Sequence, residues 1–424
     1  MTHRGASRVQ HGMKRVTVSH LPAFVRAALP LPLAFAVACS PTSAFRSFGR
    51  EPSTPYEQYA KSLRDAGLDQ TGMGREWLAA SDSALRTPLS ATLPAREVGW
   101  YARGEARAVA YQVTVRGGQR LRATLRGDGQ RARYFLDLFE RSDDTTGAFV
   151  HRVSADSLAA PDSVAVLMGL EFETTRDQQV VIRFQPELLR GGRYELTLQV
   201  EPTLAFPVEG RGNEAIQSFY GAGRDGGRRE HHGIDIFAPR GTPVLAATDG
   251  VVRSTSPNTL GGNVVWLTDT RRRQTLYYAH LDTQLVQGGQ QVRTGDTLGL
   301  VGNTGNARTT PPHLHFGIYV AGQGPVDPLL HVQRETRTVP DLRADTGVLG
   351  RAASTRLAAV TLRASPNATG DSVGRVGRET PIRIMGASAG WFRVQLDDGT
   401  AGYVTTTSIR VMPERTDGGE IRRQ

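Results

Sequence analysis

The chain has 424 residues, of which 39% are hydrophobic, and a formal net charge of +10. This composition excludes a fibrous or wholly disordered protein, and the length allows about two to four domains. Half of the net charge lies before residue 39, in a segment that contains no acidic residue: Arg4, Arg8, Lys14, Arg15 and Arg26. The modest excess that remains suits an anionic polymer as a partner, and no nucleic-acid motif accompanies it.

Arginine makes up nearly all of the basic residues. Lys14 and Lys61 are the only lysines, whereas lysine and arginine together number 51. We interpret this as a codon bias of the genome, which weakens any argument from a single arginine.

The first 38 residues are typical of a bacterial signal peptide. Basic residues precede an apolar run over 27–38, which ends Ala36-Val37-Ala38 before Cys39. The run is too short to span a bilayer as a helix, which disfavours a retained membrane anchor. The small residues before Cys39 resemble a lipobox, which implies a lipid on Cys39 and attachment to a membrane. Ala36 replaces the commoner Leu, so ordinary signal cleavage stays open as the alternative.

Cys39 is the only cysteine in the chain. If Cys39 carries a lipid, no thiol is left for a disulfide, a cysteine-based zinc site or a cysteine nucleophile.

Residues 39–202 are predicted to form a linker with short helices followed by a β-sandwich. Within the linker, 39–90, apolar residues at helical spacing predict helices over 56–67 and 75–85. Over 91–202, short alternating runs between Gly, Asp and Pro turns predict an antiparallel β-sandwich, with an edge-like strand over 194–200. This segment resembles the pre-peptidase modules of secreted bacterial enzymes. We expect its one histidine, His151, at the surface, because no partner stands at metal-ligand spacing.

Residues 203–333 contain six of the ten histidines, and five of the six fall in three short motifs: His231, His232, His280, His313 and His315. Side chains alternate between the two faces of a strand, so residues two or four apart share a face. His231 can therefore point the same way as Asp235, with only Gly233 between them to leave room for an ion. His313 and His315 also share a face, and the residues that alternate with them form an apolar face suited to a core: Leu314, Phe316 and Ile318.

Histidine and aspartate in this pattern predict a catalytic metal site. Zinc in such sites keeps three protein ligands and an open position for water, and His231, Asp235 and His315 supply two imidazoles and one carboxylate. His280 and His313 are left to accept a proton, to stabilise charge on a carbonyl oxygen and to return a proton to a leaving amine. His232 alternates to the face opposite Asp235 and is expected to be a bystander at the rim. His331 is assigned no role.

Three ordered motifs resemble the lysostaphin-type, LytM-like zinc endopeptidases, which cut the peptide part of peptidoglycan. They are His231 to Asp235 (HxGxD), Tyr278 to Leu281 (YxHL) and His313 to Phe316 (HLHF). The resemblance implies one Zn²⁺ per chain on His231, Asp235 and His315, with His280 and His313 as the catalytic pair. Thr309-Thr310-Pro311-Pro312 departs from the usual Gly and single Pro before the last motif, which is expected to reshape the rim of the groove.

The remaining residues are predicted to form a linker over 334–352, a small SH3-like barrel over 353–413 and a disordered tail over 414–424. Gly390-Trp391-Phe392-Arg393-Val394 and Gly402-Tyr403-Val404 resemble the bacterial SH3-like module that binds cell-wall peptide. Core packing is the alternative for Trp391 and Tyr403, and it is the favoured interpretation of Trp391.

Together these features predict a mainly β, multidomain protein: an antiparallel β-sandwich, a β-rich metallopeptidase domain with a central antiparallel sheet, and a small SH3-like barrel. The expected function is zinc-dependent hydrolysis of peptide bonds in peptidoglycan by a protein exported to the bacterial envelope and facing the periplasm. The alternatives are a catalytically silent relative that activates a cell-wall amidase, and a protease for a protein substrate.

Overall fold

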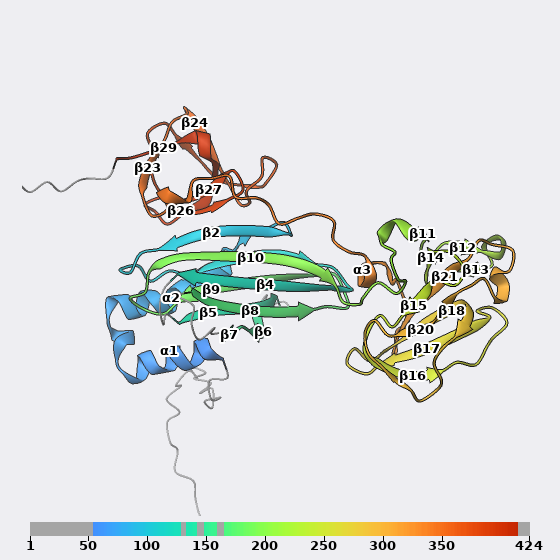
Figure 1. The fold of residues 1–424 in the computed structure, drawn as a ribbon. Coiled ribbons are helices and arrows are strands. Elements are labelled where there is room, and N and C mark those ends of the chain that lie inside the picture. Colours follow the sequence, from blue (N-terminus) through green and yellow to red (C-terminus); the bar gives the residue numbers. More distant parts are fainter. Residues whose placement is uncertain (1–53, 129–132, 142–147, 159–164, 414–424) are drawn as a thin grey trace, which may run out of the picture. The chain divides into compact units, whose positions relative to one another are not determined.

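The computed structural model describes residues 54–128, 133–141, 148–158 and 165–413 (Figure 1). The expected signal peptide, the lipid site at Cys39 and the tail over 414–424 lie outside these ranges. Within them, no helix is both long enough and apolar enough to cross a bilayer. The structure is mainly β with several antiparallel sheets, as expected from the sequence.

Two helices come first, where the periodicity predicts them. Helix α1 (Pro55–Asp65) begins with a capping box between Thr54 and Glu57, and α2 (Gly72–Arg86) is capped by the Thr71 side chain. Trp77 of α2 is buried against Phe135, and its indole N–H donates to the Pro186 carbonyl at 2.8 Å. The helices are thereby fixed to one face of the following sandwich.

The sandwich consists of two sheets around one core. The strands, in spatial order, are β1 (Leu89–Ser90), β3 (Val109–Val115), β9 (Gln178–Pro186), β5 (Tyr134–Arg141) and β6 (Phe149–Ser154) in one sheet, and β2 (Ala95–Tyr101), β10 (Gly192–Pro202), β4 (Gln119–Asp128), β8 (Ala165–Glu173) and β7 (Asp156–Leu158) in the other. All pairs are antiparallel except β1 with β3.

The prediction of an edge strand over 194–200 is wrong. Strand β10 lies inside its sheet and pairs with β2 on one side and β4 on the other. Its alternating burial reflects one face toward the core and one toward solvent, and such a pattern does not report whether the strand's hydrogen-bonding edges are paired.

The next domain is an antiparallel sheet with one face in a hydrophobic core. Its main path is β11 (Ile216–Ser218), β14 (Ile234–Phe237), β21 (His313–Val320), β18 (Gln274–Gln284), β17 (Asn263–Asp269), β16 (Gly250–Ser254) and β19 (Gln291–Val292), joined by β15 (Pro243–Leu245), β20 (Thr297–Val301) and β22 (Gly324–Val326). Leu314, Phe316 and Ile318 are fully buried in this core, as the alternation along β21 predicts. The opposite face of β21 is left for His313 and His315.

The C-terminal strands form the predicted small β domain. They are β23 (Ala352–Thr355), β24 (Ala359–Arg363), β25 (Ser372–Gly377), β26 (Pro381–Ser388), β27 (Trp391–Gln395), β28 (Ala401–Thr405) and β29 (Ile409–Val411). Strand β26 pairs with β2, and a buried ion pair joins the Arg393 guanidinium to Glu97 at 2.9 Å. Tyr403 belongs to the core cluster of the sandwich, and Trp391 packs against it. Both aromatic side chains are therefore packing residues here.

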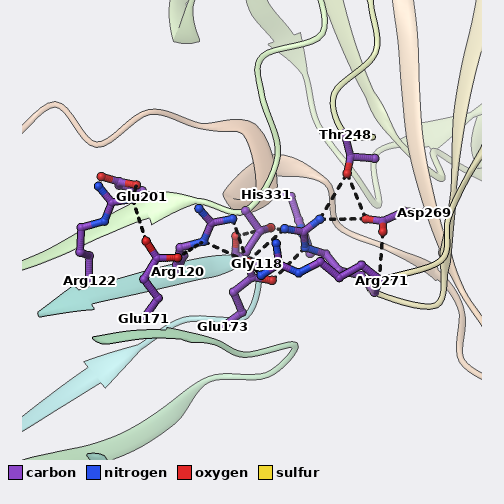
Figure 2. A network of polar contacts seen from close by, with 12 residues as sticks. Gly118, Arg120, Arg122, Glu171, Glu173, Glu201, Thr248, Asp269, Arg271 and His331 are labelled. Atoms are coloured by element: carbon purple, nitrogen blue, oxygen red, sulfur yellow. Dashed lines mark hydrogen bonds and ion pairs between the residues drawn. The ribbon is translucent and has the colours of Figure 1, made fainter. Parts of the chain in front are cut away.

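A polar network joins the sandwich to the histidine-containing sheet (Figure 2). Arg272, which follows β17, contacts both carboxylate oxygens of Glu173 at 2.9 and 3.0 Å, and Arg120 contacts the same carboxylate at 2.8 Å. His331 of the short helix α3 (Leu329–Val332) lies 3.0 Å from the Thr203 hydroxyl through its Nδ1.

Candidate metal centre and catalytic cleft

A cavity of about 520 Å³ is lined by His280 of β18, by His313 and His315 of β21, and by His231, which precedes β14. The register pairs Asp235 of β14 with His315 of β21, and His315 in turn with Ala279 of β18. Adjacent strands lie about 5 Å apart, so this register brings side chains that are distant in sequence to one point.

Two histidines and one aspartate converge in this cavity. His231 Nε2 lies 2.9 Å from His315 Nδ1 and 3.0 Å from Asp235 Oδ1, and the last two atoms are 3.1 Å apart. His231 and Asp235 are buried, and His315 is partly buried. The structure thus brings together the three residues that the sequence proposes as metal ligands.

His231 reaches this position by a route that the alternation argument does not describe. The argument places His231 and Asp235 on one extended strand, but β14 begins only at Ile234, and His231 lies in the connection from β13 (Arg229–Glu230). Backbone hydrogen bonds to Ala222 and Gly221 hold His231 there instead.

Gly233 permits the close approach of His315. A Cβ atom at position 233 would lie 2.5 Å from the Phe316 carbonyl oxygen and 2.7 Å from the His315 ring. The space that we expected to be left for an ion is occupied by the ring of this proposed ligand.

Backbone carbonyls fix the orientation of three imidazoles. The Nδ1 atoms of His231, His280 and His313 lie 2.9, 2.9 and 2.8 Å from the carbonyl oxygens of Phe219, Thr304 and Pro311. A carbonyl oxygen only accepts, so each Nδ1 carries the proton and each neutral ring keeps its lone pair on Nε2.

The donor set fits a metal cation. With Nδ1 protonated, His231 presents a lone pair on Nε2 to the His315 nitrogen and the Asp235 carboxylate. Three electron-rich atoms at about 3 Å are stabilised only by a proton or a cation between them, and two imidazoles with one carboxylate are ligands that zinc accepts.

Asp235 is ionised in this environment. Burial by itself would raise the pKa of Asp235, but hydrogen bonds to His231 and His315 outweigh it and hold that pKa well below its usual range. The carboxylate is therefore available as an anionic ligand at any physiological pH.

His280 lies beside His313 in the same cavity, with 5.1 Å between the ring centroids. Its backbone has φ +64°, a left-handed conformation that is uncommon for a residue with a side chain. Burial, followed by the nearby His315 and His313, lowers the pKa of His280 to about 4. The ring is therefore neutral at neutral pH. His313 stacks on Phe237 at a centroid separation of 4.9 Å.

The two remaining histidines of this domain lie apart from the cluster. His232 is exposed and stacks on Tyr220, as expected for a rim residue. His331 is buried at the sandwich junction, away from the cavity, where it has a structural contact rather than a role in the site.

Sequence reasoning missed Arg224. Its guanidinium Nη2 donates to Asp235 Oδ2 at 2.7 Å and to the Ser218 hydroxyl at 2.6 Å. None of the three histidine motifs includes Arg224. Arginine is also so frequent in the chain that a single arginine does not stand out.

Two segments of the chain match known families. Residues 229–328 match Peptidase family M23, and residues 358–409 match the Bacterial SH3 domain. The first segment contains all five residues of the predicted site.

Curated relatives resemble the chain over the same region. The peptidoglycan DD-endopeptidase ShyC of Vibrio cholerae is 39% identical over 119 residues, which is 28% of this chain and 25% of that protein. The L-Ala–D-Glu endopeptidase of Bacillus subtilis is 38% identical over 123 residues, which is 27% of this chain and 37% of that protein. The chain thus spans well under half of the length of these relatives.

Among solved structures, the catalytic domain of the antimicrobial peptidase lysostaphin from Staphylococcus simulans has 32% sequence identity and a TM-score of 0.24. The match covers 27% of this chain and 86% of that chain. The chain carries a peptidase family M23 (LytM-like) domain and a bacterial SH3 domain.

Proposed function

We propose that this protein is a zinc-dependent endopeptidase that hydrolyses peptide bonds in the stem peptides or cross-bridges of peptidoglycan. The convergence of His231, Asp235 and His315, whose ligand atoms lie 2.9–3.1 Å apart beside His280 and His313 in one cavity, carries the proposal. The M23 match and the names of the two endopeptidase relatives support the substrate class.

One zinc ion would be held by His231 Nε2, Asp235 Oδ1 and His315 Nδ1. In such a site, zinc supplies a Lewis acid that polarises a carbonyl and lowers the pKa of water. The carbonyl contact on His231 Nδ1 keeps its Nε2 free for this task, which is how ligand histidines are commonly oriented.

His280 and His313 handle protons and charge. His280 is neutral because of its low pKa and points its unprotonated Nε2 away from the Thr304 carbonyl, so it can accept a proton from attacking water. His313 is held by the Pro311 carbonyl and the Phe237 ring, and in its protonated form it can stabilise an oxyanion or return a proton to the leaving amine.

The cavity walls suit an extended peptide. Trp266, Tyr277 and Tyr319 form one aromatic group along β17, β18 and β21, and the Tyr277 ring lies 5.8 Å from the ring of His315. Aromatic side chains give a large contact area at low entropic cost, so they can hold the substrate chain next to the proposed ligands.

The proposed setting is the bacterial envelope, with the protein exported, lipid-anchored through Cys39 and facing the periplasm. The SH3 domain would add wall binding by raising the local concentration of the polymer. Mass spectrometry of the purified native protein tests the anchor, because a lipid on Cys39 adds the mass of its acyl chains.

The function is tested with the full mature chain on purified peptidoglycan. We expect release of peptide fragments that stops with a chelator and returns with zinc. Asp235→Ala is expected to lose zinc, whereas His313→Ala keeps zinc and loses about 10²- to 10⁴-fold in turnover, the usual contribution of a general acid or base.

Matched controls separate these effects from general damage. Asp249→Ala removes an exposed carboxylate of the same domain, and His232→Ala removes the exposed neighbour of His231; both should keep zinc. A wild-type chain that is inert on every peptidoglycan but stimulates an added amidase would refute the enzyme and support the silent regulator.

A further inference from the structure

The two oxygens of the Asp235 carboxylate have different partners. Oδ1 faces His231 Nε2 and His315 Nδ1, at 3.0 and 3.1 Å, whereas Oδ2 accepts from the Arg224 guanidinium at 2.7 Å. Asp235 is only 7% exposed, so Oδ2 has little access to water as an alternative partner. The guanidinium therefore fixes the rotation of the carboxylate about its Cβ–Cγ bond.

Arg224 itself is held in place by its surroundings. The same Nη2 that contacts Asp235 donates to the Ser218 hydroxyl at 2.6 Å, and Ser218 pairs with Asp235 across β11 and β14. Its strand β12 (Gly223–Arg224) pairs with β13 immediately before His231. The backbone of the same segment binds His231, since His231 N–H donates to the Ala222 carbonyl at 2.9 Å.

We propose that Arg224 is a positioning residue for the metal site: it occupies Asp235 Oδ2 and so presents Oδ1 alone as the ligand. This inference rests on the zinc site proposed above. The segment 221–224 thereby supports two of the three ligands, Asp235 through a side chain and His231 through the backbone.

Two effects of the guanidinium on zinc affinity oppose each other. Its positive charge repels a cation nearby, and its hydrogen bond orients a ligand that would otherwise rotate. The charge is partly exposed and already paired with Oδ2, which reduces the repulsion, whereas the orientation acts directly on a ligand atom. Orientation is therefore expected to dominate, and removal of such an outer hydrogen bond commonly weakens metal binding by about 10- to 100-fold.

The test measures zinc affinity of the full mature chain by competition with a chromophoric chelator, with no reliance on activity. Arg224→Met, which keeps bulk but has no donor, is expected to bind zinc about 10- to 100-fold more weakly. Arg224→Lys should recover part of the loss, because its ammonium retains a donor for Oδ2. Arg240→Met is the matched control, since Arg240 forms an exposed ion pair with Asp282 in the same domain.

Replacement of zinc by cobalt gives an absorption spectrum that a general loss of stability would not change. The visible absorption of Co²⁺ reports its ligand geometry, so it should shift in Arg224→Met and stay unchanged in Arg240→Met. If Arg224→Met does not fold, Arg224→Gln, which is polar and too short to reach Oδ2, answers the same question.

Zinc affinity and a cobalt spectrum equal to those of the wild type would overturn the positioning role, and so would tighter binding, which would mean that repulsion dominates. A wild-type chain that binds no zinc would refute the metal site as well. Normal wild-type binding with an unaffected Arg224→Met would refute the role of Arg224 alone.

Discussion

Gly233 shows how a single missing side chain can shape the proposed metal site. A Cβ atom there would lie 2.5 Å from the Phe316 carbonyl oxygen and 2.7 Å from the ring of His315. Carbon atoms in contact need about 3.5 Å or more, so either the ring or the backbone would have to move. His315 is the residue that such a movement would displace.

Gly233→Ala is therefore expected to weaken zinc binding by at least about 10-fold, because displacement of one of three ligands costs at least as much as loss of an outer contact. Equilibrium dialysis against zinc measures the effect. Gly288→Ala is the control, because its nearest neighbour would lie at an ordinary 3.8 Å. Equal zinc binding by the two variants would show that the ring of His315 has room to adjust.

Some residues of the proposed site could be predicted from the sequence, and one could not. His231, Asp235 and His315 could be proposed because histidine is rare in this chain and clusters in three motifs. Arg224 could not be proposed, because one arginine among so many gives no signal in the sequence. Its contact with Asp235 also forms only when the chain folds. The assigned roles stay predictions until metal and turnover are measured.

Strand β18 departs from regular geometry at the position of a proposed catalytic residue. A register shift interrupts its pairing with β17 between Tyr278 and Leu281, and another interrupts its pairing with β20 between Leu281 and Thr283. His280, within the first of these shifts, has φ +64°. A non-glycine residue in such a conformation costs about 1–3 kcal/mol, and strain of this kind is concentrated at functional sites. The irregularity directs the ring of His280 toward His313.

The strain makes a prediction about stability. His280→Gly should be more stable than His280→Ala by about 1 kcal/mol, because glycine adopts positive φ without a steric penalty. At the neighbouring Ala279, whose φ is not positive, replacement by Gly should instead destabilise by about 0.5–1 kcal/mol. Denaturant unfolding of the full chain measures both. The same order at the two positions would show that the left-handed conformation at 280 is not maintained.

Whether a segment forms a helix or a strand was easier to predict from the sequence than which strands pair with one another. The two helices and most strands fall where periodicity places them, because amphipathic spacing is a local property. The position of β10 inside its sheet was not predictable, because pairing on both edges depends on β2 and β4, which lie far away in sequence.

At the scale of the whole molecule, His331 connects the sheet of the M23-like domain to the sandwich (Figure 2). Burial, followed by the nearby Arg272, lowers the pKa of His331 to about 4 from 6.5. The unfolded chain therefore binds a proton below about pH 6.5, whereas the folded protein does so only below about pH 4.

Stability is consequently expected to fall as the pH drops from 6.5 to 4, with a contribution from His331 of about 3 kcal/mol. The free energy of unfolding at pH 7 and pH 4 measures this loss. His331→Asn, which has no titrating ring, should lose about 3 kcal/mol less than the wild type over the same interval. Parallel losses in the two proteins would assign the acid sensitivity to other groups.

The domain boundaries stay predictions, although both family matches fall inside the predicted ranges. Sequence patterns set the SH3 domain apart by a polar linker over 334–352, which follows the domain over 203–333. In the structure, the SH3 domain packs against the sandwich. Tyr403 of the SH3 domain donates to Glu97 of the sandwich, and Arg393 pairs with the same carboxylate.

The Glu97 carboxylate, which Arg393 and Tyr403 share, limits the use of the SH3 domain outside this protein. A fragment over 353–413 used as a wall-binding tag would leave the guanidinium of Arg393 without its anion and would expose Tyr403 to water. Engineering of such a tag would therefore begin with the replacement of these two side chains, and transplantation into another enzyme would succeed only with a surface redesigned in this way.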